Sequence, residues 1–305
     1  TSTNKIAVLN INGPIISEPA NFYRFAGMGN FDAIYPTLIE SYLTDLQKEK
    51  VLGLIVSINS PGGSVSASHT IYNLFNQFKI KNNIPLYFYS TDMLTSGAYW
   101  VSLSANKIFT NYGALIGSIG VKGPDWIYYN SPTSLSTGLL GNAVESPKGI
   151  ELFSNTAGIS KDILNPFRQP SKKEISQLQN MVNNIYNDFV NLVSSNRKIE
   201  KNIVVNEIGA MIYNSKEAQK HYLIDGQKNI NETIEVMAKE LNLDNINIIS
   251  NNKKNLFNFQ KFNFFMNVLD NKQYTLNENL INKKFCNNIK NEFSVATFNF
   301  YSSMC

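Results

Sequence analysis

The chain has 305 residues, a formal net charge of +4 at pH 7 and 43% hydrophobic residues. These values indicate a globular protein with a sizeable core, organised as one large domain or two small ones. The charge is modest for this length and the basic residues are mostly dispersed, so we expect no nucleic-acid partner. No stretch approaches the roughly 18 consecutive apolar residues that a transmembrane helix needs.

The two cysteines, Cys286 and Cys305, both lie near the end of the chain. They form neither a metal-ligand spacing nor a disulfide framework, although a disulfide between the two stays open. We therefore expect no metal and no other cofactor. The N-terminal sequence TSTNKIAVLNI lacks a charged region followed by an apolar core and does not begin with methionine, so we expect a fragment or a processed form.

Strands and helices alternate in the first part of the chain. The run 52–58 (LGLIVSI) is apolar except for one serine, which is typical of a buried strand, whereas 32–49 has apolar residues at helical spacing. By the same criteria we expect strands at 5–12, 52–58, 86–90 and 107–110, and helices at 32–49, 65–78 and 96–104. Repeated strand-then-helix units predict an α/β fold in which helices cover a sheet.

The clearest helix is predicted at 171–197, where Ser171 and Glu174 form a capping box. Its apolar stripe is suited to a core or a subunit interface and consists of Ile175, Leu178, Val182, Ile185, Phe189 and Val193. A short helix within 207–227, a helix at 232–241 and a strand at 245–249 follow. From Asn251 the composition shifts to Asn, Lys and Phe, which indicates an irregular packing arm or partial disorder.

Adjacent glycines follow the buried strand, in NSPGGSV at 59–65. Gly62 and Gly63 carry no Cβ atom, so a ligand can approach the backbone and its N–H groups can be aimed into a cleft. The alternative is that PGG is only a turn between a strand and a helix.

A Ser-Gly pair, Ser96 and Gly97, lies between the predicted strand 86–90 and the helix 96–104. A serine at the start of a helix is suited to nucleophilic attack, because the first N–H groups of the helix favour developing negative charge. The alternative is that Thr95 and Ser96 simply cap a buried helix.

Five motifs in this order resemble the bacterial signal peptide peptidase A family of serine proteases: INSPGGSV, TSGAYWVSLSANKIFT, GALIGSIGV, AGISKDILNPFRQPSKKE and NSKEAQKHYLID. The resemblance covers roughly residues 5 to 230. It implies a ClpP/crotonase-like spiral of repeated ββα units with a long C-terminal helical segment. We therefore expect a protease domain at 1–240 and an Asn/Lys/Phe-rich extension at 241–305.

The resemblance implies a Ser–Lys dyad in which Ser96 is the nucleophile and Lys161 the general base. Lysine acts as a base only when it is neutral, and burial lowers its pKa. Gly63 and Gly97 would form the oxyanion hole, and Ser118 would orient the lysine. The segment 124–160 is longer than the family pattern, so Lys148 competes with Lys161 for the role of base, although its surroundings predict an exposed loop.

The only two histidines, His69 and His221, are predicted to be structural or on the surface, which disfavours a Ser-His-Asp triad. No G-x-S-x-G elbow surrounds Ser96. By resemblance the chain is a serine endopeptidase for signal peptides and other membrane-derived or unfolded peptides, which it binds extended. It would be a homo-oligomer on the outer side of the bacterial cytoplasmic membrane, held by an N-terminal anchor that the given sequence does not include.

Three other functions stay open. The first is a phage capsid-processing or stomatin-associated Ser–Lys protease, and the second is a crotonase-type enzyme that acts on acyl-CoA through carboxylates. The third is a non-catalytic protein that keeps the ClpP/crotonase fold as an assembly platform.

Overall fold

The computed structural model describes residues 4–18, 32–128, 134–136, 143–145 and 155–251. The chain divides into two compact units. Unit 1 comprises residues 1–122 and 185–305, and unit 2 comprises residues 123–184. The domain boundary predicted at residue 240 stays a prediction.

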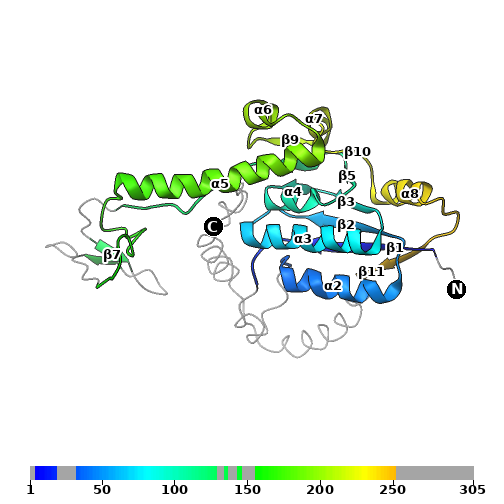
Figure 1. The fold of residues 1–305 in the computed structure, drawn as a ribbon, viewed down its shortest axis with the longest axis horizontal. Coiled ribbons are helices and arrows are strands. Elements are labelled where there is room, and N and C mark those ends of the chain that lie inside the picture. The colour runs from blue at the N-terminus through cyan, green and yellow to red at the C-terminus, as the bar shows by residue number, and fades with distance from the viewer. Residues whose placement is uncertain (1–3, 19–31, 129–133, 137–142, 146–154, 252–305) are drawn as a thin grey trace, which may run out of the picture. The chain divides into compact units, whose positions relative to one another are not determined.

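Unit 1 is built on a six-stranded sheet in the order β10-β5-β3-β2-β1-β11, and all of its strand pairs are parallel (Figure 1). The strands are β1 (Lys5–Asn12), β2 (Gly53–Asn59), β3 (Leu86–Ser90), β5 (Lys107–Thr110), β10 (Gly226–Gln227) and β11 (Asn247–Ser250). Parallel sheets need cover on both faces, which explains the continuous apolar character of β2 and β3. The predicted α/β class is confirmed.

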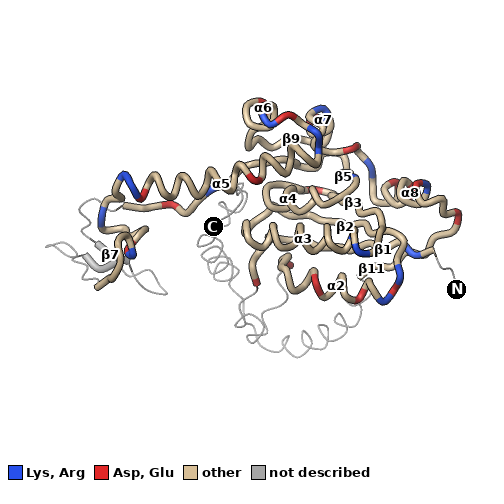
Figure 2. The backbone as a smooth tube through the Cα atoms, in the orientation of Figure 1, with Lys and Arg blue, Asp and Glu red and all other residues tan. Residues whose placement is uncertain are grey.

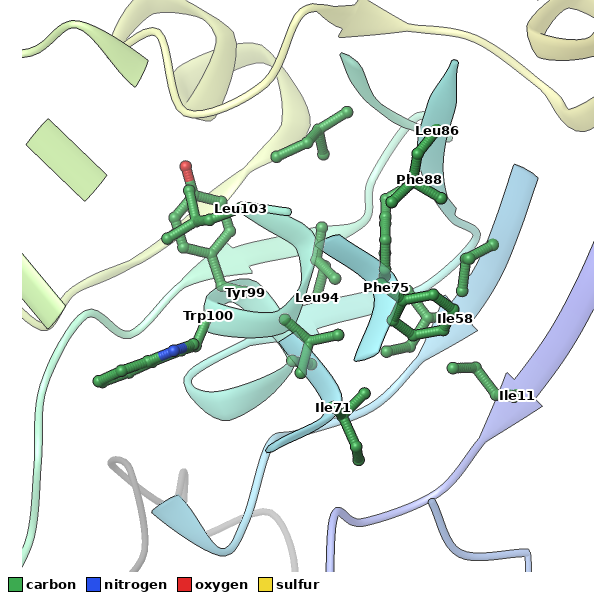
Figure 3. Packing of buried hydrophobic residues seen from close by; sticks show 14 of the residues in the cluster. Ile11, Ile58, Ile71, Phe75, Leu86, Phe88, Leu94, Tyr99, Trp100 and Leu103 are labelled. Carbon is green, nitrogen blue, oxygen red and sulfur yellow. The ribbon is translucent and has the colours of Figure 1, made fainter. Parts of the chain in front are cut away.

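Alternate residues of the strands enter two different apolar clusters. Leu54 and Phe88 pack with helices α2 (Pro36–Glu49) and α3 (Val65–Asn82) on one face of the sheet, and Figure 3 shows Phe88 beside Phe75 of α3. The ring centroids of Phe75 and Phe88 are 5.4 Å apart in an edge-to-face arrangement. Ile55 and Tyr87 belong to the other cluster, which includes Met237 of α8 (Ile230–Glu240). The sheet therefore has helices on both faces.

A second, three-stranded sheet of unit 1 lies at the carboxyl end of β2. It consists of β4 (Met93–Thr95), β6 (Leu115–Gly117) and β9 (Ile212–Asn214). Strand β4 is parallel to β6, and a bridge between Ser60 and Leu94 links β4 to the end of β2. The segment β3, β4 and α4 (Gly97–Ser102) forms one strand-strand-helix unit.

The long helix predicted at 171–197 is α5 (Lys172–Arg197), and the capping box is present between Ser171 and Glu174. Phe189 and Val193, in the later half of its stripe, are buried in the core of unit 1. In the earlier half, which belongs to unit 2, Ile175 is 53% exposed. The core role of the stripe is therefore confirmed for the later half only.

The remaining elements are short. Unit 2 contains an antiparallel pair, β7 (Ser134–Ser136) and β8 (Ala143–Glu145). Unit 1 contains α6 (Lys201–Ile203), a π-helical turn at Val204–Ile208 and α7 (Ser215–Lys220). Among the described residues, no helix is both long and apolar enough to span a membrane. Cys286, Cys305 and Lys148 lie outside the described residues.

Candidate active site

Ser96 occupies a sharp turn between β4 and α4. Its φ of 58° and ψ of −124° lie in a region that non-glycine residues rarely adopt, and such strain persists only where the surroundings impose it. Here the backbone is held from both sides: Ser96 N–H donates to the Gly117 carbonyl at 2.8 Å, and its own carbonyl accepts from Trp100 N–H at 2.9 Å. Helix α4 begins at Gly97 and ends at Ser102, so it is shorter than the predicted helix at 96–104.

The hydroxyl of Ser96 is fully buried and has no hydrogen-bond partner among the described residues. A buried hydroxyl without a partner costs about 1–3 kcal/mol, so most buried serines are bonded. Ser68, equally buried and nearby in the fold, follows that rule: its hydroxyl donates to the Ser64 carbonyl at 2.8 Å. Ser96 therefore departs from that rule, as do the buried polar groups of Thr95, Trp100 and Thr110 among the described residues; its strained turn and the neighbouring glycines distinguish Ser96 from them.

Two glycine N–H groups lie close together beside Ser96. A Cβ atom built on Gly97 would lie 3.3 Å from the Gly63 nitrogen, and one built on Gly62 would lie 2.5 Å from the Gly97 nitrogen and 2.8 Å from the Ser96 Cβ. Gly62 and Gly63 have φ of 92° and 149°, which favour glycine. Neither the Gly63 nor the Gly97 N–H donates a hydrogen bond within the described part of the chain. The structure thus brings together three of the predicted site residues.

Asn59 holds the loop that leads to this turn. Its Oδ1 accepts hydrogen bonds from the Ser90 hydroxyl at 3.1 Å, from Thr91 N–H at 3.0 Å and from Asp92 N–H at 2.9 Å. The side-chain amide of one residue at the end of β2 therefore fixes residues 90–92 at the end of β3, from which the chain continues through β4 to Ser96. This role was not predicted, although a polar residue directly after an apolar strand was a visible signal.

Ser118 lies one residue beyond Gly117, the backbone partner of Ser96. It is buried, has a φ of 54°, and its N–H donates to the Met211 carbonyl at 2.8 Å. The register of β4 and β6 pairs Thr95 with Gly117, which places Ser118 next to the Ser96 turn. The predicted role of Ser118, which is to orient Lys161, stays a prediction.

Lys161 belongs to unit 2, whereas the other predicted site residues belong to unit 1. Its N–H donates to the Gly158 carbonyl at 3.2 Å, and its side chain is exposed. Unit 2 by itself therefore does not supply the burial that a neutral lysine base needs. The pairing of Ser96 with Lys161 stays a prediction.

The two histidines are placed as the sequence suggested. His69 is exposed and its ring makes an edge contact with Trp100 at 6.5 Å between centroids, while His221 stacks at a tilt on Tyr213. No cluster of three or more potential metal ligands exists among the residues that the structure describes.

The sequence model described as Peptidase family S49 matches residues 79–244, which is more than half of the chain. The chain belongs to peptidase family S49. This match confirms the resemblance to signal peptide peptidase A that the five motifs predicted.

Several relatives of the S49 chain carry protease names. A protein of Methanocaldococcus jannaschii assigned as a protease is 31% identical over 208 residues, or 68% of this chain and 62% of the relative. A protein of Enterococcus faecium assigned as signal peptide peptidase SppA is 27% identical over 252 residues, or 81% of this chain and 67% of the relative. The chain thus spans about two thirds of the length of these relatives.

Similar solved structures include a membrane-bound stomatin-specific protease in complex with a substrate peptide, with a TM-score of 0.46 and 15% identity over 81% of this chain and 91% of that chain. They also include ClpP1 of Listeria monocytogenes, with a TM-score of 0.43 and 12% identity over 73% of this chain and 92% of that chain.

Proposed function

We propose that this S49 chain is a serine endopeptidase in which Ser96 attacks the substrate carbonyl and Lys161 is the general base. The observation that carries the proposal is the state of Ser96: a buried, unpaired hydroxyl on a strained turn, next to two glycine N–H groups that have no acceptor among the described residues. Each of these features costs stability, and together they are what a nucleophile with an oxyanion hole requires.

In the proposed mechanism, neutral Lys161 takes the proton of the Ser96 hydroxyl as its oxygen attacks the peptide carbonyl. The carbonyl oxygen becomes an oxyanion and accepts hydrogen bonds from the Gly63 and Gly97 N–H groups. Protonated Lys161 then gives its proton to the leaving amine, and an acyl-enzyme remains. Water, deprotonated by the same lysine, hydrolyses this ester. Ser118 orients the lysine, and no metal or cofactor takes part.

The strained backbone of Ser96 serves this mechanism. The turn lies between β4 and the first N–H of α4, that of Gly97, and in the proposed mechanism this N–H stabilises the oxyanion. Gly62 allows the backbone at residue 62 to lie close to Gly97, because a Cβ atom at residue 62 would lie only 2.5 Å from the Gly97 nitrogen. In this proposal the oxyanion donors are held by the backbone before substrate binds, and such preorganised donors lower the barrier most.

Lys161 needs desolvation from beyond unit 2, because its side chain is exposed there. We propose that a second copy of the chain covers it, in a homo-oligomer. Mixing Ser96→Ala protein with Lys161→Ala protein tests this arrangement. Recovered cleavage supports a dyad shared between copies, whereas inactivity of the mixture, with both parents folded, supports a dyad within one chain.

The substrates that we propose are signal peptides and other membrane-derived or unfolded peptides, bound in extended form. This proposal rests on the family and on the name of the Enterococcus faecium relative. Extended binding through backbone hydrogen bonds tolerates many sequences, which is compatible with substrates as varied as these peptides. The site of action would be the outer side of the bacterial cytoplasmic membrane, with an N-terminal anchor holding the protein there.

Peptide cleavage by the purified protein tests the dyad. We expect cleavage by the unaltered chain and by Lys148→Ala, and none by Ser96→Ala or Lys161→Ala, with folding of each variant checked by circular dichroism. Loss with Lys148→Ala but not with Lys161→Ala would keep the serine mechanism and move the base to Lys148. Absence of cleavage by the unaltered, assembled protein would favour the non-catalytic platform.

A further inference from the structure

Beside Lys161 in unit 2 lies a network of charged side chains that the proposed mechanism does not use. We infer that Arg168 is a positioning residue for Lys161: it fixes the two residues that flank the lysine and thereby the point from which its side chain extends. The inference rests on the proposed function, because it takes Lys161 as the general base.

Lys161 lies within a run of tight turns. Its N–H donates to the Gly158 carbonyl at 3.2 Å, and Ile163 N–H donates to the Ser160 carbonyl at 3.1 Å. Ser160 and Leu164 have φ of 60° and 70°, in the left-handed region that non-glycine residues seldom occupy. A strained loop of this kind keeps its shape only where other contacts hold it.

Those contacts converge on Arg168. Its Nε and Nη2 donate to the two carboxylate oxygens of Asp162 at 2.6 and 2.8 Å, and its Nη2 and Nη1 donate to those of Glu174 at 2.7 and 3.0 Å. The Ser160 side chain is hydrogen-bonded to Glu174. Both neighbours of Lys161 in sequence are therefore tied to one cluster, while Lys161 itself stays exposed.

The cluster is itself anchored to rigid parts of unit 2. Glu174 is buried in the first turn of α5, where its carboxylate accepts from Ser171 N–H at 2.8 Å and from the Ser171 hydroxyl at 2.9 Å. Basic and acidic residues lie together at this end of α5 (Figure 2). The Arg168 guanidinium also lies 5.2 Å from the ring centroid of Trp126, in a cation–π contact. Hydrogen bonds from Arg168 hold the pKa of Glu174 well below its usual range, so the carboxylate stays ionised.

The chemistry of this role requires a guanidinium. Its planar fork of five N–H donors can bond both carboxylates at once, whereas a lysine ammonium at position 168 is a point charge that cannot reproduce two paired contacts. The base itself has a long, flexible side chain, so its nitrogen reaches a productive position only if its backbone is fixed. Small displacements of a reacting group cost about 100-fold in rate.

The test compares Arg168→Lys with a matched control, Arg197→Lys, in the full-length protein. Arg197 also makes a paired contact with a carboxylate, that of Asp225, at 2.9 and 3.2 Å, but it lies in unit 1. We expect both changes to lower the melting temperature. Only Arg168→Lys should lower kcat, by about tenfold or more, and KM should stay unchanged because the proposed role of Arg168 acts through Lys161 and not on the substrate. A second variant, Asp162→Asn, should lower kcat in the same way if Arg168→Lys fails to fold.

The outcomes separate this inference from the proposed function. A kcat for Arg168→Lys and Asp162→Asn within about twofold of the unaltered protein, with Lys161→Ala inactive, would refute the positioning role and leave the dyad intact. If kcat falls equally in Arg197→Lys, the loss of activity reflects general destabilisation, and this result would also refute the positioning role of Arg168. Full activity of Lys161→Ala, or no activity of the unaltered chain, would overturn the proposed function, and the role of Arg168 with it.

Discussion

Replacing Ser96 with alanine should abolish cleavage and at the same time stabilise the protein. The change removes a fully buried hydroxyl without a partner among the described residues, and it leaves the backbone hydrogen bonds of the turn in place. Since such a hydroxyl costs about 1–3 kcal/mol, Ser96→Ala should raise the free energy of unfolding by about 1 kcal/mol or more. The natural residue is then kept for chemistry at the expense of stability.

Ser68→Ala provides the matched comparison. Ser68 is just as buried, but its hydroxyl donates to the Ser64 carbonyl, so its removal should cost about 0.5–1.5 kcal/mol. That carbonyl also accepts from Ser68 N–H at 3.0 Å, which places the expected cost at the lower end of the range. The two variants should thus change stability in opposite directions and melt about 4 °C or more apart. Thermal and urea unfolding measure the difference, and a Ser96→Ala protein less stable than the unaltered chain would refute the reasoning.

Three further predictions concern unit 1. Gly97→Ala should destabilise the fold by about 1–3 kcal/mol, since its Cβ would lie 2.3 Å from the Ser68 Oγ. Adding Ser68→Ala should restore part of the stability in urea unfolding. It should not restore cleavage, because alanine keeps its own N–H but its Cβ would still lie 3.3 Å from the Gly63 nitrogen and obstruct that donor; restored cleavage would show that the Gly63 N–H stays accessible. Asn59→Ala should lower the free energy of unfolding by about 1–2 kcal/mol, because the hydrogen bonds from residues 90–92 to the Asn59 side chain are lost. An unchanged melting temperature would show that other contacts hold this loop. Burial raises the pKa of Tyr87 to about 12, so its contribution to stability is present below pH 10 and lost as the pH rises towards 12. Between these pH values the free energy of unfolding should therefore fall less steeply with pH in Tyr87→Phe than in the unaltered protein. An equal fall in the two proteins would argue against the shift.

Much of the fold follows from apolar patterns in the sequence. The strands at 5–12, 86–90 and 107–110 have the predicted bounds, because each is long or apolar enough to show its burial. Strands β4, β6 and β9 were missed, since three residues are too few to show a period. The predicted last strand is present as β11, shifted to Asn247–Ser250.

The sequence predicts the site residues of unit 1 better than the surroundings of Lys161 in unit 2. Gly63, Ser96 and Gly97 carry their own signal, because glycine pairs and a Ser-Gly step mark places where the backbone must come close to something. Arg168 carried none: an arginine in a polar loop is usually solvated, and its two carboxylate partners become visible only in three dimensions. The exposure of Lys161 within unit 2 was not predicted either, since the resemblance to the family implied a buried base.

Covalent labelling tests the central claim most directly. The assembled protein, incubated with a fluorophosphonate that reacts only with activated serines, would be digested and its peptides analysed by mass spectrometry. We expect one adduct, on Ser96, that forms much more slowly in Lys161→Ala and does not form in Ser96→Ala. An adduct on another serine, or labelling of Ser96 at an equal rate without Lys161, would contradict the proposed Ser–Lys mechanism.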